Sequence, residues 1–297
     1  MKKNNKVALV TGATGFVGSH LTRYLVNKGW AVHIIIRPQS KIETIYGLRR
    51  KITIHKYNGT TIEMVRILKL SQPQIVFHLA SLFLAGHQSS DIISLIQSNI
   101  LFGTQLAEAM VKNGVYKMVN TGTSWQHYNN EDYNPVNLYA ATKQAFESIL
   151  EFYLESTSLK IITLKLFDTY GPNDSRPKLF NLLKKSAKKS SLPMSDGKQL
   201  LDIVYIDDII NAYMIAAERL LSNKAGKHEH YAISSNHPIS LRNVIAVYEK
   251  TTESKLPIKW GARSYRPREV MIPWNKGKKL PGWDPQIPLE KGIKRII

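Results

Sequence analysis

The residues of this 297-residue chain best suited to chemistry are Tyr139 and Lys143, which lie four positions apart. The segment from Leu138 to Leu154 has helical apolar spacing, so both side chains are expected on one helix face. An ammonium near a phenol favours the phenolate, so Tyr139 is predicted to exchange a proton near neutral pH, well below its reference pKa of about 10. The pair indicates general acid–base catalysis, although the same spacing is also common on helices without function.

A second motif, near the N-terminus, predicts a ligand site beside which this pair would act. The short apolar run from Val7 to Val10 leads into a loop with glycines at positions 12, 15 and 18, and a helix is expected from Ser19 to Lys28. Such glycines let the backbone approach a pyrophosphate, and the N-terminal amides of the helix favour the phosphates. The sequence therefore predicts a dinucleotide site made by Gly12, Thr14, Gly15, Phe16, Val17 and Gly18.

Both motifs fall within the alternating pattern of an α/β protein. Short apolar runs predict strands at about 7–10, 32–36, 52–55, 75–79, 117–121 and 161–166, with helices between them. This order is typical of a Rossmann-type doubly wound parallel sheet. We expect a dinucleotide-binding domain of residues 1–170 plus about 200–235. A smaller C-terminal substrate-binding subdomain is expected from about 171–199 plus 236–297, which are rich in Lys, turns and Pro.

Together the motifs resemble extended short-chain dehydrogenases/reductases, the family of nucleotide-sugar epimerases, dehydratases and ketoreductases. Eight family landmarks occur in order: TGATGFVG (11–18), IVFHLAS (75–81), NILFGTQLAEA (99–109), VNTGTS (119–124), YAATK (139–143), LKLFDTYGP (164–172), IVYIDDI (203–209) and RPREV (266–270). The match runs nearly from end to end. It is strong evidence for the family and much weaker evidence for the substrate.

The resemblance implies that Thr123, Tyr139 and Lys143 are catalytic. In the family, a serine or threonine hydroxyl bonds the reacting carbonyl oxygen, the tyrosine exchanges the proton, and the lysine stabilises the phenolate and holds the nicotinamide ribose. Thr121 and Ser124 are close alternatives for the hydroxyl role.

The resemblance also implies what surrounds the nicotinamide. Leu79, Ala80 and Ser81 are expected to line its site at the end of the fourth strand. His78 is expected to be a packed strand residue. Asn99 is either a polar helix residue near the active site or an ordinary helix cap.

The choice of cofactor is predicted from the residue after the second strand. NAD enzymes commonly place an acid there to accept hydrogen bonds from the ribose hydroxyls. This chain has Arg37, whose guanidinium suits a 2′-phosphate, so we expect NADP(H). The alternative is that Arg37 is a solvent-exposed residue that caps the end of the strand and does not bind the cofactor. Asn58 and Gly59 stand where relatives often carry an acid that binds adenine. No residue of this chain is therefore predicted to contact the adenine.

Substrate contacts are expected from polar and aromatic residues downstream. Arg266 and Arg268 are candidates for the diphosphate, because arginine binds phosphate through two parallel hydrogen bonds, and either could do so. Relatives often carry an arginine where this chain has Leu201, which removes one expected anion contact. The basic candidates could equally be solvated surface charges. The full set of predicted substrate residues is Ser124, Trp125, Asp168, Arg176, Lys178, Asn181, Arg266 and Arg268.

Departures from the family narrow the reaction that the resemblance implies. Sugar 4,6-dehydratases carry Asp and Glu directly after the threonine, whereas Ser124 and Trp125 follow Thr123 here. Relatives that epimerise at C3 and C5 use a cysteine, and this chain has none. What remains is a 4-ketoreductase, or a C4 epimerase with tightly bound NAD. Arg37 favours the reductase, which consumes NADPH.

Within this family, the amino-acid sequence most resembles those of bacterial 4-ketoreductases of the CDP-abequose synthase type. This implies reduction of CDP-3,6-dideoxy-4-keto-glucose to CDP-abequose for O-antigen and lipopolysaccharide biosynthesis. The residues alone do not select CDP over dTDP, UDP or GDP, nor an abequose-type over a paratose-type product. A more distant alternative is a non-catalytic NADP(H)-sensing or interaction module, against which the intact Thr123, Tyr139 and Lys143 argue.

The composition limits the partners. The net charge of +19 could indicate nucleic acid, but Lys184, Lys185, Lys188 and Lys189 follow the spacing of a solvated helix face without interleaved aromatics. No nucleic-acid partner is therefore expected. The basic surface would instead steer an anionic nucleotide sugar and NADP(H) toward the cleft.

Targeting signals and metal sites are not expected either. No apolar run approaches the roughly 18–20 residues of a membrane span, and the polar stretch from Met1 to Lys6 leaves no room for a signal peptide. We therefore expect no membrane partner and a cytoplasmic location.

Without cysteine, thiolate metal sites are excluded, and no metal site is predicted. Relatives often form homodimers through four helices, which would use residues 101–111 and 146–154 here.

Overall fold

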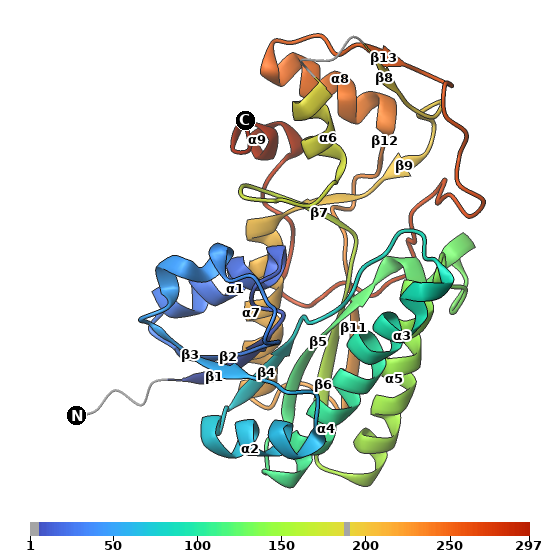
Figure 1. The fold of residues 1–297 in the computed structure, drawn as a ribbon. Helices are drawn as coiled ribbons and strands as arrows, with labels where there is room; N and C mark the ends of the chain where they lie inside the picture. The colour runs from blue at the N-terminus through green and yellow to red at the C-terminus, as the bar shows by residue number, and fades with distance from the viewer. Residues whose placement is uncertain (1–5, 187–190) are drawn as a thin grey trace.

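The computed structural model describes residues 6–186 and 191–297. Its centre is a parallel seven-stranded sheet in the order β11-β6-β5-β4-β1-β2-β3 (Figure 1). These strands are β1 (Val7–Thr11), β2 (Ala31–Ile36), β3 (Ile52–Lys56), β4 (Ile75–His78), β5 (Lys117–Thr123), β6 (Lys160–Leu166) and β11 (His228–Ile233). The predicted doubly wound Rossmann-type fold and its six predicted strands are confirmed, and β11 adds the edge strand beside β6.

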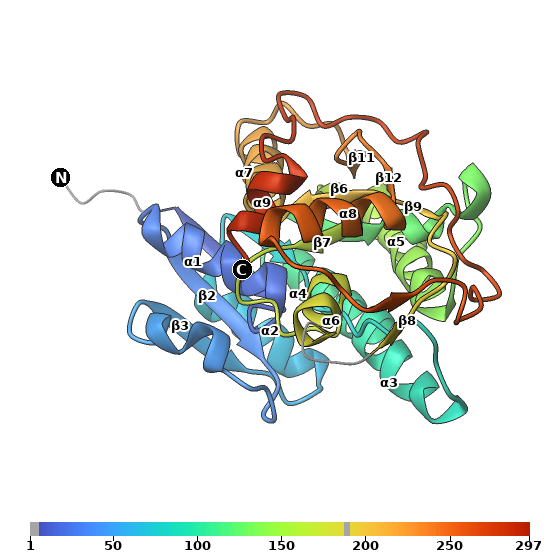
Figure 2. The same cartoon turned by 90° about the horizontal axis from the view of Figure 1, so that it is seen from above.

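Helices cover both faces of this sheet (Figures 1 and 2). Strand residues alternate between two cores, as the pleat requires: Ala8 and Val10 belong to one core and Leu9 to the other. The first core includes α1 (Phe16–Asn27) and α7 (Ile206–Leu221). The second includes α2 (Thr61–Ser71), α4 (Phe102–Lys112) and α5 (Leu138–Ser156). The predicted helix at 138–154 is therefore confirmed.

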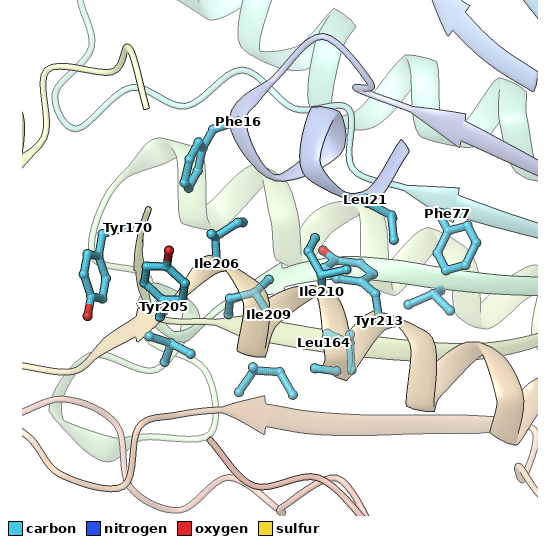
Figure 3. Close-up of a cluster of buried hydrophobic side chains, with 14 of the residues drawn as sticks. Phe16, Leu21, Phe77, Leu164, Tyr170, Tyr205, Ile206, Ile209, Ile210 and Tyr213 are labelled. Atoms are coloured by element: carbon cyan, nitrogen blue, oxygen red, sulfur yellow. The ribbon is translucent and has the colours of Figure 1, made fainter. Parts of the chain in front are cut away.

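Figure 3 shows part of the first core, where α7 fills the space between α1 and the sheet. Its residues Ile206, Ile210 and Tyr213 are buried among side chains such as Leu21 and Phe77. This packing fixes α1, and therefore the glycine loop that precedes it, against the carboxyl ends of the strands.

A smaller group of elements lies beyond the carboxyl ends of the sheet strands (Figure 1). It contains three short strand pairs, β7 with β10, β9 with β12, and β8 with β13. The elements are β7 (Asp168–Tyr170), α6 (Leu179–Ser186), β8 (Leu192–Pro193), β9 (Leu200–Leu201), β10 (Ile203–Tyr205), β12 (Ile239–Ser240), α8 (Leu241–Thr252), β13 (Ile258–Lys259) and α9 (Leu289–Lys294). The domain boundaries given above remain a prediction.

Shorter helical segments connect the larger elements. They are η1 (Glu43–Leu48), η2 (Ser89–Asp91), α3 (Ile92–Ile96), the π-helical η3 (Gln97–Leu101), η4 (Ser124–Gln126) and η5 (Tyr128–Asn130). Of the predicted basic helix face, Lys184 and Lys185 lie in the last turn of α6, and Lys188 and Lys189 lie outside the described residues. No helix within residues 6–186 and 191–297 has the length and hydropathy that a membrane span needs.

Candidate active site

A cleft of about 260 Å³ opens at the carboxyl ends of β1, β4 and β5, where the strand order reverses. In doubly wound sheets this is the place where ligands bind. The cleft brings together most of the predicted cofactor and catalytic residues: Gly12, Gly15, Phe16, Val17, Gly18, Leu79, Ser81, Thr123, Tyr139 and Lys143. Five of the predicted substrate residues also line it: Ser124, Trp125, Asp168, Arg176 and Lys178.

The glycine loop has the close backbone contacts of a dinucleotide cradle. Gly12 has φ +69°, and a Cβ there would lie 2.7 Å from the backbone nitrogen of Ala80. A Cβ on Gly18 would overlap the carbonyl oxygen of Gly12. Gly15 is the N-cap of α1 and supplies no side chain to the first amides of the helix. The loop therefore fits a pyrophosphate, whose charge those amides and the helix dipole would stabilise.

Two of the predicted cofactor residues act through the backbone. Ala80 donates its N–H to Thr11 Oγ1 at 3.1 Å, and the carbonyl of Thr14 accepts a hydrogen bond from Thr44 Oγ1 at 3.1 Å. Neither Ala80 nor Thr14 is among the residues that line the cleft. The structure gives both a part in shaping the loops around it.

Tyr139 lies in the first turn of α5, between Ser81 and Thr123. Asn137 begins the helix by accepting a hydrogen bond from the N–H of Ala140 at 3.0 Å. The surrounding protein raises the pKa of Tyr139 to about 12, against the opposing effects of hydrogen bonds with Ser81 and Thr123. We predicted a lowered pKa; that prediction is wrong here because loss of water around the phenol dominates.

Lys143 lies one turn further along α5, and only 1% of its surface is exposed. Burial lowers the pKa of its ammonium to about 8, and the carboxylate of Glu147 opposes this shift. Glu147 is itself buried and forms an ion pair of 3.2 Å with Lys165 Nζ. Gln126 Nε2 donates to its other oxygen at 3.1 Å. Glu147 and Lys165 were not predicted as site residues, although Glu147 continues the four-residue spacing of Tyr139 and Lys143.

Asn99 holds the loop after β4 against α5. Its Oδ1 accepts hydrogen bonds from the N–H of Leu82 at 2.7 Å and from Ser81 Oγ at 3.1 Å, and its Nδ2 donates to Thr142 Oγ1 at 2.9 Å. It lies inside the π-helical turn η3, a geometry that is frequent at functional sites. The alternative that Asn99 is an ordinary helix cap is therefore wrong, and the residue positions Ser81.

His78 is a packed strand residue, as predicted. It is 1% exposed, and its Nδ1 forms a hydrogen bond of 2.9 Å with Thr11 Oγ1. Burial and the neighbouring charge of Lys143 lower its pKa to about 3. The imidazole is therefore neutral at physiological pH.

An aromatic wall, which we define as Phe83 and Trp125, lies beside the tyrosine in the lining of the cleft. The ring centroid of Phe83 lies 5.0 Å from that of Tyr139 and 5.6 Å from that of Trp125. Lys178 Nζ lies 4.6 Å from the Phe83 centroid and forms an ion pair of 3.1 Å with Asp168. Phe83 was not predicted, because a single phenylalanine in a loop carries no sequence signal.

Thr121, an alternative for the catalytic hydroxyl, also lines the cleft, but its hydroxyl is already bonded within the protein. Its hydroxyl donates to the carbonyl of His78 at 2.8 Å and bonds the hydroxyl of Tyr213 at 2.6 Å. Thr123 lines the cleft together with Tyr139. Tyr213 also lines the cleft but was not predicted, because it lies within the apolar pattern of α7.

Arg176 and Asn181 form a structured turn beside the cleft. The guanidinium of Arg176 donates to Asp174 at 2.8 Å and to the carbonyl of Thr169 at 2.9 Å. The Asn181 amide donates to the carbonyl oxygens of Asp174 and Arg176. Arg176 lines the cleft, whereas Asn181 lines neither cavity and supports the turn from behind.

A second, smaller cavity adjoins the first and shares Ser124, Trp125 and Asp168 with it. Arg266 lines this cavity, pairs with Glu269 at 2.8 Å, and lies 5.5 Å from the Trp125 ring centroid. Leu201, where relatives often carry a basic residue, is also in the lining.

The linings of the two cavities include neither Arg268 nor Arg37. Arg268 is exposed, donates to Asn134 and lies 4.3 Å from the Tyr128 ring centroid. Arg37 is exposed directly after β2, and its N–H donates to Ser40 Oγ at 3.0 Å. Neither contributes to the lining of these two cavities, so the structure favours Arg266 over Arg268 as the arginine nearer the cleft.

The fold and the cleft together define a Rossmann-type protein with the tyrosine and lysine of the short-chain dehydrogenases/reductases. The model of the NAD dependent epimerase/dehydratase family matches residues 8–234. The chain belongs to this family, as the resemblance predicted.

Individual relatives match along most of their length. CDP-abequose synthase of Salmonella typhimurium is 26% identical, over 97% of this chain and 96% of the relative. UDP-glucuronate 4-epimerase of Thermodesulfobacterium geofontis is also 26% identical, over 97% and 94%. The solved UDP-glucuronic acid 4-epimerase from Bacillus cereus, in complex with UDP-glucuronic acid and NAD, has a TM-score of 0.85 at 25% identity, over 97% and 96%.

Proposed function

We propose that the protein uses NADPH to reduce the C4 keto group of a nucleotide-activated deoxysugar. The favoured substrate is CDP-3,6-dideoxy-4-keto-glucose and the favoured product CDP-abequose, a precursor for O-antigen and lipopolysaccharide in the cytoplasm. The full-length similarity to CDP-abequose synthase supports this assignment. Relatives named as 4-epimerases are equally similar, so a C4 epimerase with tightly bound NAD is the second candidate.

The observation that carries the proposal is the aromatic wall of Phe83 and Trp125 beside Tyr139 in the cleft. A sugar that lacks hydroxyls at C3 and C6 has apolar edges that can pack on such rings. A hexose would have to remove the water from its hydroxyls against the same rings, and an unpaired polar group costs free energy when it is buried. The wall therefore favours a deoxygenated sugar.

The chain's own residues can complete such a reduction. The glycine loop and Lys143 would hold the nicotinamide nucleotide, which supplies a hydride from C4 when it is bound. The Thr123 hydroxyl would donate a hydrogen bond to the carbonyl oxygen, and Tyr139 would give that oxygen its proton. With a pKa of about 12, Tyr139 carries this proton at neutral pH. The nearby ammonium of Lys143 would then stabilise the phenolate until solvent returns a proton.

Arg37 is proposed to select NADPH, because its exposed guanidinium follows β2 at the carboxyl edge of the sheet. Replacing Arg37 with Asp is expected to lower the ratio of kcat/KM for NADPH to that for NADH by about 10–100-fold, since a charge-assisted hydrogen bond is worth roughly 1.5–3 kcal/mol. Steady-state kinetics with both cofactors measure this ratio. Arg50→Asp, which makes the same charge change at another exposed site, is the control. An unchanged ratio in Arg37→Asp would refute the assignment.

The reaction itself is tested by following reduced nicotinamide with CDP-3,6-dideoxy-4-keto-glucose generated in situ. Stoichiometric loss of NADPH and an axial C4 hydroxyl, assigned by NMR, are expected. An equatorial hydroxyl would indicate the paratose-type reductase. Interconversion of a UDP- or CDP-hexose without net loss of NADPH would indicate the epimerase.

A homodimer is proposed as the assembly. Apolar side chains on the helices named for this contact are exposed, with Leu101 at the end of η3 and Phe152 on α5. Exposed apolar surface of this kind often marks an interface.

A further inference from the structure

We propose that Glu151, His228 and His230 form a binding site for a divalent transition-metal ion, with Zn²⁺ as the preferred occupant. Each of the three residues can offer one ligand atom, and the three atoms lie within 4.8 Å of one another. The site lies outside the catalytic cleft, where α5 packs beside the edge strand β11. The sequence did not predict it, because Glu151 and His228 are 77 positions apart.

The position of the two histidines follows from the strand. His228 and His230 are two residues apart on β11, so their side chains lie on the same face of the sheet. Their ring centroids are 3.9 Å apart. Glu151 comes from the facing helix α5, and its Oε1 lies 2.8 Å from His228 Nδ1. Two rigid elements therefore supply the three ligands.

This donor set suits Zn²⁺. Two imidazole nitrogens and one carboxylate oxygen are a common zinc set, at bond lengths of about 2.0–2.2 Å, with the fourth position open to water. Tetrahedral ligands at such bond lengths are separated by roughly 3.4 Å. The exposed end of Glu151 can make the small adjustment required. Mg²⁺ and Ca²⁺, which prefer oxygen ligands, are not expected to bind.

The surroundings also resemble those of a metal site. Metal-bound histidines usually make a further hydrogen bond that fixes the ring. His228 Nε2 lies 3.4 Å from Thr163 Oγ1. His230 Nδ1 is buried without a hydrogen-bond partner among the described residues, and the carboxylate of Glu147 lies 3.7 Å from it. The nearby positive charge of Lys227 is already paired with Glu155 at 3.1 Å.

An ion at this site would join the middle of α5 to the edge of the sheet. Lys143, Glu147 and Glu151 follow one another at four-residue intervals, so they lie on one face of this helix. The ion would therefore stabilise the helix that carries Tyr139 and Lys143. Because it contacts neither residue, its direct effect would be on stability.

The proposal is tested by titrating the tag-free, full-length protein with Zn²⁺ in a calorimeter. One equivalent is expected to bind with a dissociation constant at or below about 10 µM. His228→Gln, His230→Gln and Glu151→Gln are each expected to weaken binding at least tenfold. His33→Gln is the matched control, because His33 and His55 also form a close pair of rings, at a centroid distance of 5.2 Å.

Thermal unfolding gives a second readout that does not depend on activity. Zn²⁺ is expected to raise the Tm of the wild type and of His33→Gln, but not that of Glu151→Gln, and Mg²⁺ is expected to leave Tm unchanged. Glu151 is largely exposed, so its variant is expected to fold. Binding that persists in all three ligand variants, or a dissociation constant of the wild type above about 10 µM, would overturn the proposal.

Discussion

Replacement of Tyr139 by phenylalanine is expected to lower kcat by about 10²–10⁴, the usual contribution of a positioned general acid. The variant keeps the ring and its edge-to-face contact with Phe83 but loses the hydroxyl between Ser81 and Thr123. The carbonyl oxygen would then have to take its proton from water. The decrease should be seen as slower consumption of NADPH at saturating substrate.

Two further measurements separate loss of chemistry from loss of structure. Binding of NADPH, followed by its fluorescence, is expected to be nearly unchanged in Tyr139→Phe, because the glycine loop is intact. Tyr133→Phe removes a hydroxyl from a half-exposed tyrosine that lines neither cavity, and it should retain full activity. Full activity in Tyr139→Phe would falsify the assignment of Tyr139 as the proton donor. Equal losses in both variants would point to a general effect on folding.

The sequence was sufficient to predict the sheet and the cofactor loop, because these depend on local patterns. The six strands are short apolar runs whose alternate residues face two cores, as Ala8 and Leu9 do in β1. Gly12 and Gly18 must lack a Cβ for reasons that lie within one loop and its neighbouring strand. Tyr139 and Lys143 share one helix, so their common face could be derived from their spacing.

Other parts of the site depend on contacts between distant segments. Phe83 is one residue of an irregular loop, and it reaches the cleft because Asn137 on α5 donates to the carbonyl of Leu84 at 3.1 Å. Arg266 and Arg268 are two residues apart and chemically identical, yet one lines a cavity and the other packs over Tyr128. The direction of the pKa shift of Tyr139 depended on its burial, which spacing alone does not give.

The buried pair of Glu147 and Lys165 gives the second large expected effect. Their side chains are 3% and 5% exposed, and they are 3.2 Å apart. Glu147→Gln leaves the Lys165 ammonium buried without a counter-charge, and breaking such a pair typically costs about 3–5 kcal/mol. The free energy of unfolding, measured with urea, should fall by this amount. Lys165→Met in the same chain removes the buried charge, so the double variant should recover more than half of the loss.

Glu147→Gln should also shift the pH dependence of the reaction. Burial lowers the pKa of Lys143 to about 8, and the carboxylate of Glu147 keeps it from falling further. The ammonium is present below that pKa and is lost as the pH rises through it. Without Glu147 the pKa falls further, so the decline of kcat on the alkaline side should move to lower pH. Lys165 also lowers the pKa of Lys143, so the test compares the pH–rate profile of the double variant with that of Lys165→Met alone, and the two proteins then differ only at Glu147. If the alkaline limb of the double variant coincided with that of Lys165→Met, Glu147 would serve stability alone and would not hold the charge of Lys143.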